Sequence, residues 1–348
     1  MKLLILTQKV NRDDPILGFF CRWITEFAKH FESIVVIALE TQKETIQSLP
    51  TNVKVFSLGK ENKFEKGLGK FKYILRFYKY IWSLRNEYDA VFVHMNQEYV
   101  LLGFILWKIF RKKIYMWRNH YSGNYMTRLS VWLCNKVFCT SKYSYTARFK
   151  KTKLMPVGVD TDFFKPIENI TRNKNTILSL GRISSSKNIH ILVDALLELD
   201  SEGVQFEAYI YGDALPKDLE YKKQLIDKVS SSGSNKILFC NGVPNYKTPE
   251  IYSAFDIFVN LTPSGSYDKT MFEAAACGCA VIAFNRDLFS EFGPEYVIQE
   301  QNERFVAQKF KQFFDLNRPK KNLREITVKN QSLRLLAVQL QRELSISK

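Results

Sequence analysis

The sequence predicts an α/β protein built from two Rossmann-like, doubly wound domains in tandem, and three observations support this prediction. The chain has 348 residues, which is more than one hydrophobic core usually organises. Short β-branched runs alternate with longer helical patterns, as in parallel sheets covered by helices on both faces. The pattern begins again near Thr176, after a turn-rich, polar segment. We therefore expect domains at residues 1–165 and 166–330, then a terminal helix at 331–348 that packs back on the first domain.

Strands in the first domain are expected where β-branched and aromatic residues form short apolar runs. These runs are residues 3–6, 34–38, 53–56, 90–93, 113–116 and 136–139. Two long helices are expected at residues 18–31 and 71–85, where aromatic residues recur near helical spacing. Such aromatic stripes usually face a hydrophobic core.

The second domain repeats this alternation of strands and helices. Its strands are expected at residues 177–180, 206–211, 237–239, 257–260 and 280–284, and its helices at 189–199, 217–230, 249–253 and 270–276. One or two further helices are expected between residues 323 and 344. Ligands of open α/β sheets bind beyond the carboxyl ends of the strands, so we expect the two domains to face a central cleft.

The charge of the chain is concentrated in its first half. Residues 1–162 contain 27 Lys and Arg against 13 Asp and Glu, a net charge of +14, whereas residues 163–348 contain 24 against 22, a net charge of +2. Residues 99–159 contain 12 basic residues and no acidic one. Such an imbalance favours an anionic partner, namely a membrane surface, a diphosphate-bearing acceptor or nucleic acid. A merely solubilising basic surface is the alternative.

The cysteines and the apolar segments bear on the compartment of the protein. The six cysteines show neither CxxC spacing nor the density of a disulfide scaffold, so we expect buried thiols in the cytoplasm. The first apolar run is too short for a signal peptide. The most apolar segment, residues 100–110, is about half the length of a membrane-spanning helix. We expect a cytoplasmic protein that attaches peripherally to the inner face of the cell membrane.

The segment Gly181-Arg182-Ile183-Ser184-Ser185-Ser186-Lys187 follows an expected strand and precedes an expected helix. A strand's carboxyl end would deliver Arg182 to the cleft, and Lys187 would lie just before the helix amino terminus, whose partial positive charge favours phosphate. Two fixed cations suit one diphosphate, although spacing alone fits a solvated basic loop equally well. We predict that Arg182 and Lys187 bind a diphosphate.

A second segment, residues 264–279, again joins a strand to a helix through small residues. Backbone amides around Ser266 can approach an anion. Thr270 is expected to cap the helix, and Lys269 either contacts phosphate or pairs with Asp268. Glu273, one turn into the helix, can accept both hydroxyls of a ribose. The alternative is an ordinary acidic residue near a helix amino terminus, favoured by the helix dipole.

Together these segments resemble the retaining glycosyltransferases of family 4, which have the GT-B fold. The resemblance rests on residues 156–164 (PVGVDTDFF), 181–187 and 264–282 (SGSYDKTMFEAAACGCAVI), and it extends over nearly the whole chain. It implies that Arg182 and Lys187 bind the donor diphosphate and that Glu273 binds its ribose. The family commonly has a second glutamate eight positions earlier, where this chain has Gly265. Asp268 or backbone amides around Ser266 would then replace its contacts with the donor sugar.

Polar residues after expected strands of the first half are further candidates. His94 and Asn96 follow one strand, and Arg118 and His120 follow the next. In similar enzymes a histidine at such a position contacts the donor sugar, so the resemblance implies a catalytic role for His120. We expect His94, Asn96 and Arg118 to bind the acceptor. Gly18 would open the helix near the donor phosphates.

The expected reaction is transfer of a glycosyl group from a nucleoside diphosphate sugar to an acceptor hydroxyl with retention of configuration, in cell-surface polysaccharide or glycolipid biosynthesis. The acceptor would be a sugar or a lipid-linked sugar. No metal or other cofactor is expected, because no DxD motif occurs where a metal-dependent transferase would place it. A nucleotide-sugar epimerase of the same architecture is one alternative, and a basic nucleic-acid-binding protein is another. Nucleic acid is not an expected partner, since no helix-turn-helix, zinc-finger or RNP-like motif occurs.

Overall fold

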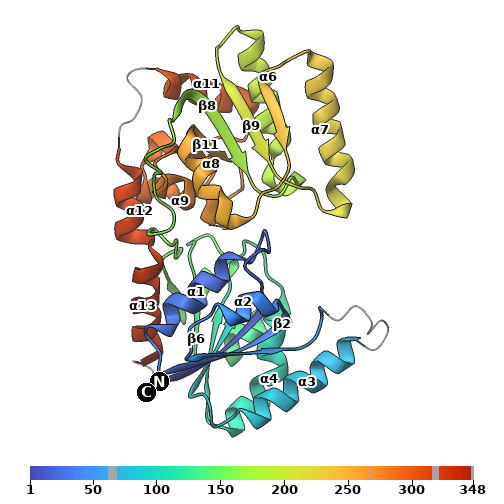
Figure 1. Ribbon diagram of the computed structural model, residues 1–348, viewed down its shortest axis with the longest axis vertical. Coiled ribbons are helices and arrows are strands. Elements are labelled where there is room, and N and C mark those ends of the chain that lie inside the picture. The colour runs from blue at the N-terminus through green and yellow to red at the C-terminus, as the bar shows by residue number, and fades with distance from the viewer. Residues whose placement is uncertain (62–68, 266, 316–320, 346–348) are drawn as a thin grey trace. The chain divides into compact units, whose positions relative to one another are not determined.

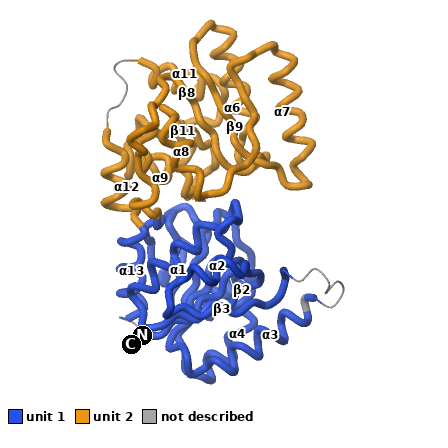
Figure 2. The backbone as a smooth tube through the Cα atoms, in the orientation of Figure 1, with its two compact units in different colours: residues 1–158, 333–348 blue, residues 159–332 orange. Residues whose placement is uncertain are grey.

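The computed structural model describes residues 1–61, 69–265, 267–315 and 321–345, and it consists of two compact units (Figures 1 and 2). Unit 1 comprises residues 1–158 and 333–348, and unit 2 comprises residues 159–332. The sequence prediction divided the chain after residues 165 and 330. The terminal helix thus lies in unit 1 although the sequence of unit 2 precedes it.

Unit 1 contains a seven-stranded parallel sheet of the doubly wound type, with the order β3-β2-β1-β4-β5-β6-β7. Its strands are β1 (Lys2–Val10), β2 (Ser33–Thr41), β3 (Val53–Ser57), β4 (Ala90–His94), β5 (Lys113–Trp117), β6 (Lys136–Cys139) and β7 (Thr152–Leu154). The sequence analysis predicted all of these strands except β7. That strand is short and two of its three residues are exposed, so it lacks the apolar run by which the others are recognised.

Helices cover both faces of this sheet. They are α1 (Phe19–Ala28), α2 (Lys43–Gln47), α3 (Gly69–Ser83), α4 (Glu98–Ile109), α5 (Tyr125–Leu133) and α13 (Leu333–Ser345). One core cluster contains side chains of α1 and α13, and the other contains side chains of α3, α4 and α5. The prediction that the aromatic stripes face a core is confirmed for Phe20, Trp23, Phe27 and Phe77, which are at most 2% exposed. It is wrong for Phe71 and Trp82 of α3, which are 61% and 53% exposed.

Unit 2 repeats the plan with five parallel strands in the order β10-β9-β8-β11-β12. The strands are β8 (Asn173–Leu180), β9 (Glu207–Tyr211), β10 (Ile237–Cys240), β11 (Phe255–Asn260) and β12 (Ala280–Ala283). The helices are α6 (Ile189–Ser201), α7 (Leu219–Ser232), α8 (Thr248–Ala254), α9 (Lys269–Ala276), α10 (Leu288–Glu291), α11 (Glu303–Phe314) and α12 (Leu323–Gln331). Two Rossmann-like domains, as predicted, thus make up the chain.

Each sheet has one point at which the strand order reverses. In unit 1 it lies between β1 and β4, and in unit 2 between β8 and β11, which are direct neighbours. The helices that follow the two strands at such a point leave toward opposite faces of the sheet. Ligands of doubly wound proteins bind beyond the carboxyl ends of the two strands at such a point.

Candidate functional site

The loop after β8 lies at the reversal point of unit 2. It runs from Gly181 through a short 3₁₀ turn, Ser185–Lys187, to Asn188, whose φ of 54° precedes the first turn of α6. Close packing fixes the start of this loop, because a Cβ atom on Gly212, at the end of β9, would lie 1.9 Å from the carbonyl oxygen of Gly181. The side chain of Asn188 donates to the carbonyl oxygen of Leu261, 2.9 Å away. That bond ties this loop to the one after β11.

The loop after β11 leads into α9, and Asp268 is the N-cap of that helix. Its carboxylate accepts hydrogen bonds from the backbone N–H of Thr270 at 3.3 Å and from the Thr270 hydroxyl at 3.0 Å. The prediction that Thr270 caps the helix is therefore wrong. Asp and Thr are both good N-cap residues. In this helix the Asp268 carboxylate accepts the hydrogen bond from the backbone N–H, and the Thr270 hydroxyl donates to that same carboxylate.

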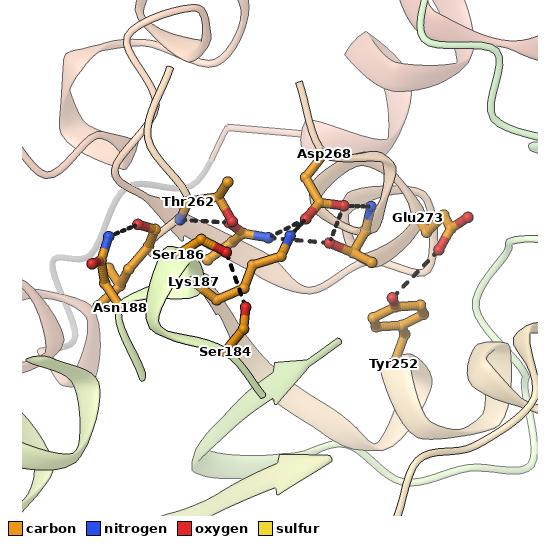
Figure 3. A network of polar contacts seen from close by, with 11 residues as sticks. Ser184, Ser186, Lys187, Asn188, Tyr252, Thr262, Asp268 and Glu273 are labelled. Atoms are coloured by element: carbon orange, nitrogen blue, oxygen red, sulfur yellow. Dashed lines mark hydrogen bonds and ion pairs between the residues drawn. The ribbon is translucent and has the colours of Figure 1, made fainter. Parts of the chain in front are cut away.

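An ion pair between Lys187 and Asp268 joins the two loops (Figure 3). The same carboxylate oxygen accepts from the side-chain amide of Asn260 at 3.1 Å. Burial alone would raise the pKa of Asp268, but the charge of Lys187 and the hydrogen bonds from Lys187, Asn260 and Thr270 lower that pKa to about 2. Asp268 is thus ionised and accepts four hydrogen bonds. This saturation argues against its serving a donor sugar as a substitute for the missing glutamate.

A pocket opens beside this pair, at the carboxyl ends of β8 and β11. Arg182 and Lys187 line it together with Asn260 and Thr262. Arg182 is exposed, and Lys187 retains 22% of its side-chain exposure. The buried hydroxyl of Thr262 has no hydrogen-bond partner among the described residues. A ligand oxygen would satisfy that hydroxyl, so the pocket offers two cations and one hydroxyl to an anion.

Asn260 and Thr262 were not among the candidates that the sequence suggested. Asn260 ends β11 and donates to Asp268 and to the hydroxyl of Thr270, at 3.1 and 3.2 Å. Its own side-chain oxygen accepts from the backbone N–H of Thr262 at 2.9 Å. Asn260 ends a buried strand and Thr262 follows that strand by two residues, which is the same kind of position that led to Arg182.

Glu273 lies one turn further along α9 and is 4% exposed. Its carboxylate accepts from the side chain of Asn245 and from the hydroxyl of Tyr252, each at 3.4 Å, and Figure 3 shows it directed toward Tyr252 of α8. Burial and the charge of Glu273 hold the pKa of Tyr252 well above its usual range, so its hydroxyl stays a donor. Long hydrogen bonds of this kind can give way to stronger ones from two ribose hydroxyls.

Three further residues of the loop after β11 were singled out from the sequence, namely Gly265, Ser266 and Lys269. Lys269 is the first residue of α9 and is partly exposed. Gly265 has a φ of 96°, in the left-handed region that favours glycine. Ser266 lies outside the described residues. The structure thus gathers Arg182, Lys187, Asp268 and Thr270 at one reversal point, with Glu273 on the next turn of the same helix.

The reversal point of unit 1 is filled by aromatic rings. The imidazole of His94 stacks on Phe20 with ring centroids 3.9 Å apart, and its Nδ1 lies 3.3 Å from the hydroxyl of Thr7. His94 is only 3% exposed, which leaves it little surface for an acceptor. Gly18 is the N-cap of α1, where a Cβ atom would lie 2.5 Å from the carbonyl oxygen of Arg12. Close backbone packing accounts for this glycine.

Asn96, Arg118 and His120 follow β4 and β5, which are neighbours in the sheet. Burial lowers the pKa of Arg118, whose Nε has no hydrogen-bond partner among the described residues. The Nδ1 atom of His120 accepts from the backbone N–H of Ser122 at 3.0 Å, and its ring stacks on Tyr121. Because Nδ1 is occupied by this hydrogen bond, Nε2 is the ring nitrogen available to contact a ligand. The proposed roles of these three residues stay predictions.

None of the helices in the described parts of the chain has the length and hydrophobicity needed to cross a bilayer. Among the same residues, no cluster of three or more His, Cys, Asp or Glu side chains has an arrangement suited to a metal ion.

Comparison with known protein families finds a match within unit 2. The model of the family described as Glycosyl transferases group 1 matches residues 160–330. Mannosylfructose-phosphate synthase of Agrobacterium fabrum is 27% identical over 160 residues, and lipopolysaccharide core biosynthesis mannosyltransferase LpsB of Rhizobium meliloti is 28% identical over 144. These matches cover 42% and 38% of this chain, and 35% and 40% of the relatives. The chain thus spans well under half the length of either relative.

Solved structures give the fold of the whole chain. HepE of Anabaena, crystallised in complex with UDP and glucose, superposes with a TM-score of 0.77 at 20% identity, over 99% of this chain and all of that one. A likeness at this level of identity bears on the fold alone. The chain accordingly has the GT-B fold, and the match to group 1 covers residues 160–330, just under half of the chain.

Proposed function

We propose that the protein is a glycosyltransferase that uses a nucleoside diphosphate sugar, and that the reversal point of unit 2 holds the donor's diphosphate. The observation that carries this proposal is the meeting of two strand-to-helix loops at one pocket. These loops contribute Arg182, Lys187 and the hydroxyl of Thr262, to which none of the described residues is hydrogen-bonded. A diphosphate carries the negative charge and the several acceptor oxygens that this set of donors requires.

The same residues provide the electrostatic catalysis that glycosyl transfer needs. Cleavage of the bond between sugar and diphosphate leaves charge on the departing phosphate, and Arg182 and Lys187 stabilise that charge as it grows. We propose that the diphosphate oxygen then takes the acceptor's proton on the same face, which gives retention of configuration. The carboxylate of Glu273 accepts hydrogen bonds from the two ribose hydroxyls. Because Arg182 and Lys187 balance the negative charge of the phosphates, we propose that the reaction needs no metal ion.

The acceptor is proposed to be a sugar of a cell-surface polysaccharide or glycolipid. Support comes from the name of LpsB, a mannosyltransferase of lipopolysaccharide core biosynthesis, and from the net charge of +14 on residues 1–162. A lipid-linked acceptor carries phosphate and is presented at a membrane surface, so it suits a basic domain.

The test is incubation with UDP-, GDP- and ADP-sugars, each with and without a sugar-lipid extract. We expect release of nucleoside diphosphate that depends on the extract, and NMR of the product should show the anomeric configuration of the donor. An epimerase would instead convert the donor sugar without an acceptor and without releasing nucleotide. Conversion of that kind would overturn the proposal. A chelator arm with EDTA tests metal independence, because activity lost on chelation would contradict it.

A further inference from the structure

Three helices on one face of the unit 1 sheet carry apolar side chains on their solvent side. α4 contacts both α3 and α5, and α3 and α4 can be followed side by side in Figures 1 and 2. Their inner faces are buried against the sheet in one core cluster. The outer face of such helices is normally polar. The outer face of these three departs from that rule.

The exposed apolar side chains recur at helical spacing. On α3, Leu75 and Trp82 are each 53% exposed; on α4, Ile105 and Ile109 are 67% and 65% exposed. On α5, Leu129 and Trp132 are 41% and 72% exposed. Each pair is separated by three, four or seven residues, so its two members lie on one side of their helix. Exposed apolar side chains gathered on neighbouring elements mark an interaction surface.

Cations interleave with these apolar residues. Lys79, Lys108 and Arg128 are exposed on α3, α4 and α5, each within four residues of an apolar residue named above. The sequence contains no Asp or Glu in α3 or α5, and α4 contains only Glu98, in its first turn. We call this surface of α3, α4 and α5 the basic apolar face. Apart from Glu98, the charged residues of these three helices are all basic.

We propose that the basic apolar face binds the surface of a bilayer that contains anionic lipid. Its cations would lie at the level of the lipid phosphates, while isoleucine and leucine side chains enter the acyl boundary. Trp82 and Trp132 match the preference of tryptophan for the membrane interface. Nucleic acid shares the charge complementarity, but it offers no apolar phase for Ile105 and Ile109. The face thus fits a membrane better than a polynucleotide.

Vesicle flotation tests the proposal. The protein should float with vesicles of phosphatidylglycerol and phosphatidylethanolamine and not with phosphatidylcholine alone. Replacing Lys79, Lys108 and Arg128 by Gln, or Ile105, Ile109 and Trp132 by Ser, should each weaken binding about tenfold or more, since each cation near an anionic surface and each inserted side chain contributes to binding. Matched control variants alter exposed residues of unit 2, with Gln at Lys217, Lys223 and Lys247, or Ser at Leu219, Ile226 and Tyr246.

Fluorescence gives an independent measure of the same contact. The chain has five tryptophans, of which Trp23, Trp107 and Trp117 are at most 4% exposed. A blue shift of emission on adding anionic vesicles would therefore arise from Trp82 and Trp132. The variant Trp82→Phe/Trp132→Phe should lose the shift while still floating with the vesicles. A shift that persists in this variant would contradict the proposed orientation.

Three results would overturn the proposal. They are flotation of the two face variants at the wild-type level, failure of the wild-type protein to float while it binds an oligonucleotide, and a vesicle-independent dimer that the Ser variant disrupts. The membrane proposal and the proposed function are separable in these assays. Thermal stabilisation by nucleoside diphosphate reports unit 2 alone and should be unchanged in the face variants.

Discussion

The two units share one topology, yet their reversal points differ in chemistry. In unit 2 the point between β8 and β11 is lined by Arg182, Lys187 and Thr262. In unit 1 the corresponding point between β1 and β4 is filled by the stacked rings of Phe20 and His94. The doubly wound sheet provides a reversal point in both units, and the surrounding side chains decide whether that point is open to an anion or filled by packed rings.

The largest expected effect on stability comes from removing an aromatic ring at the reversal point of unit 1. Phe20→Ala removes a fully buried ring and should lower the free energy of unfolding by about 3–5 kcal/mol. Chemical denaturation measures this loss. Phe305→Ala, at a ring that is 43% exposed on α11, serves as the control and should change stability by less than about 0.5 kcal/mol. Nucleotide affinity of the folded Phe20→Ala protein should match the wild type; a stable variant with impaired affinity would contradict the comparison.

A smaller effect is expected at the charged reversal point. Asp268→Asn should cost about 2–3 kcal/mol at pH 7, because the folded pKa of about 2 lies about two units below that of an unfolded Asp. A depressed folded pKa stabilises the protein above the unfolded pKa. That contribution is lost as pH falls through about 4 toward 2. Unfolding curves of both proteins over this range should therefore converge at low pH, and a difference independent of pH would refute the ion-pair account.

The smallest effect concerns the position of the missing glutamate. Gly265 has a φ of 96°, so a Cβ atom there should cost about 1–2 kcal/mol whatever the side chain carries. Gly265→Ala and Gly265→Glu should lower the midpoint of thermal unfolding to similar extents. Gly69→Ala, at the first position of α3, should be tolerated. If Gly265→Glu proves as stable as the wild type, this loop accommodates the glutamate, and its absence reflects substrate choice alone.

Local patterns predicted the strands and helices that deliver Arg182, Lys187 and Glu273, because each lies within a few residues of a strand end or a helix start. The pairing of Lys187 with Asp268 could not be read locally. The two residues are 81 positions apart, and they meet only because β8 and β11 are neighbours, which periodicity does not reveal. Thr270 and Asp268 are both good caps two residues apart, so the sequence could not choose between them. Thr262 became a candidate only because its buried hydroxyl has no hydrogen-bond partner within the described part of the chain.

We propose that Arg182 and Lys187 bind the donor diphosphate, and calorimetric titration with UDP, GDP and ADP tests this proposal most directly. Each charge-assisted hydrogen bond contributes about 1.5–3 kcal/mol, so Arg182→Ala/Lys187→Ala should weaken binding of the preferred nucleotide about 100-fold or more. Lys217→Ala/Lys223→Ala, a pair of exposed lysines elsewhere on unit 2, should leave the affinity unchanged. Undiminished nucleotide affinity in Arg182→Ala/Lys187→Ala would contradict the account.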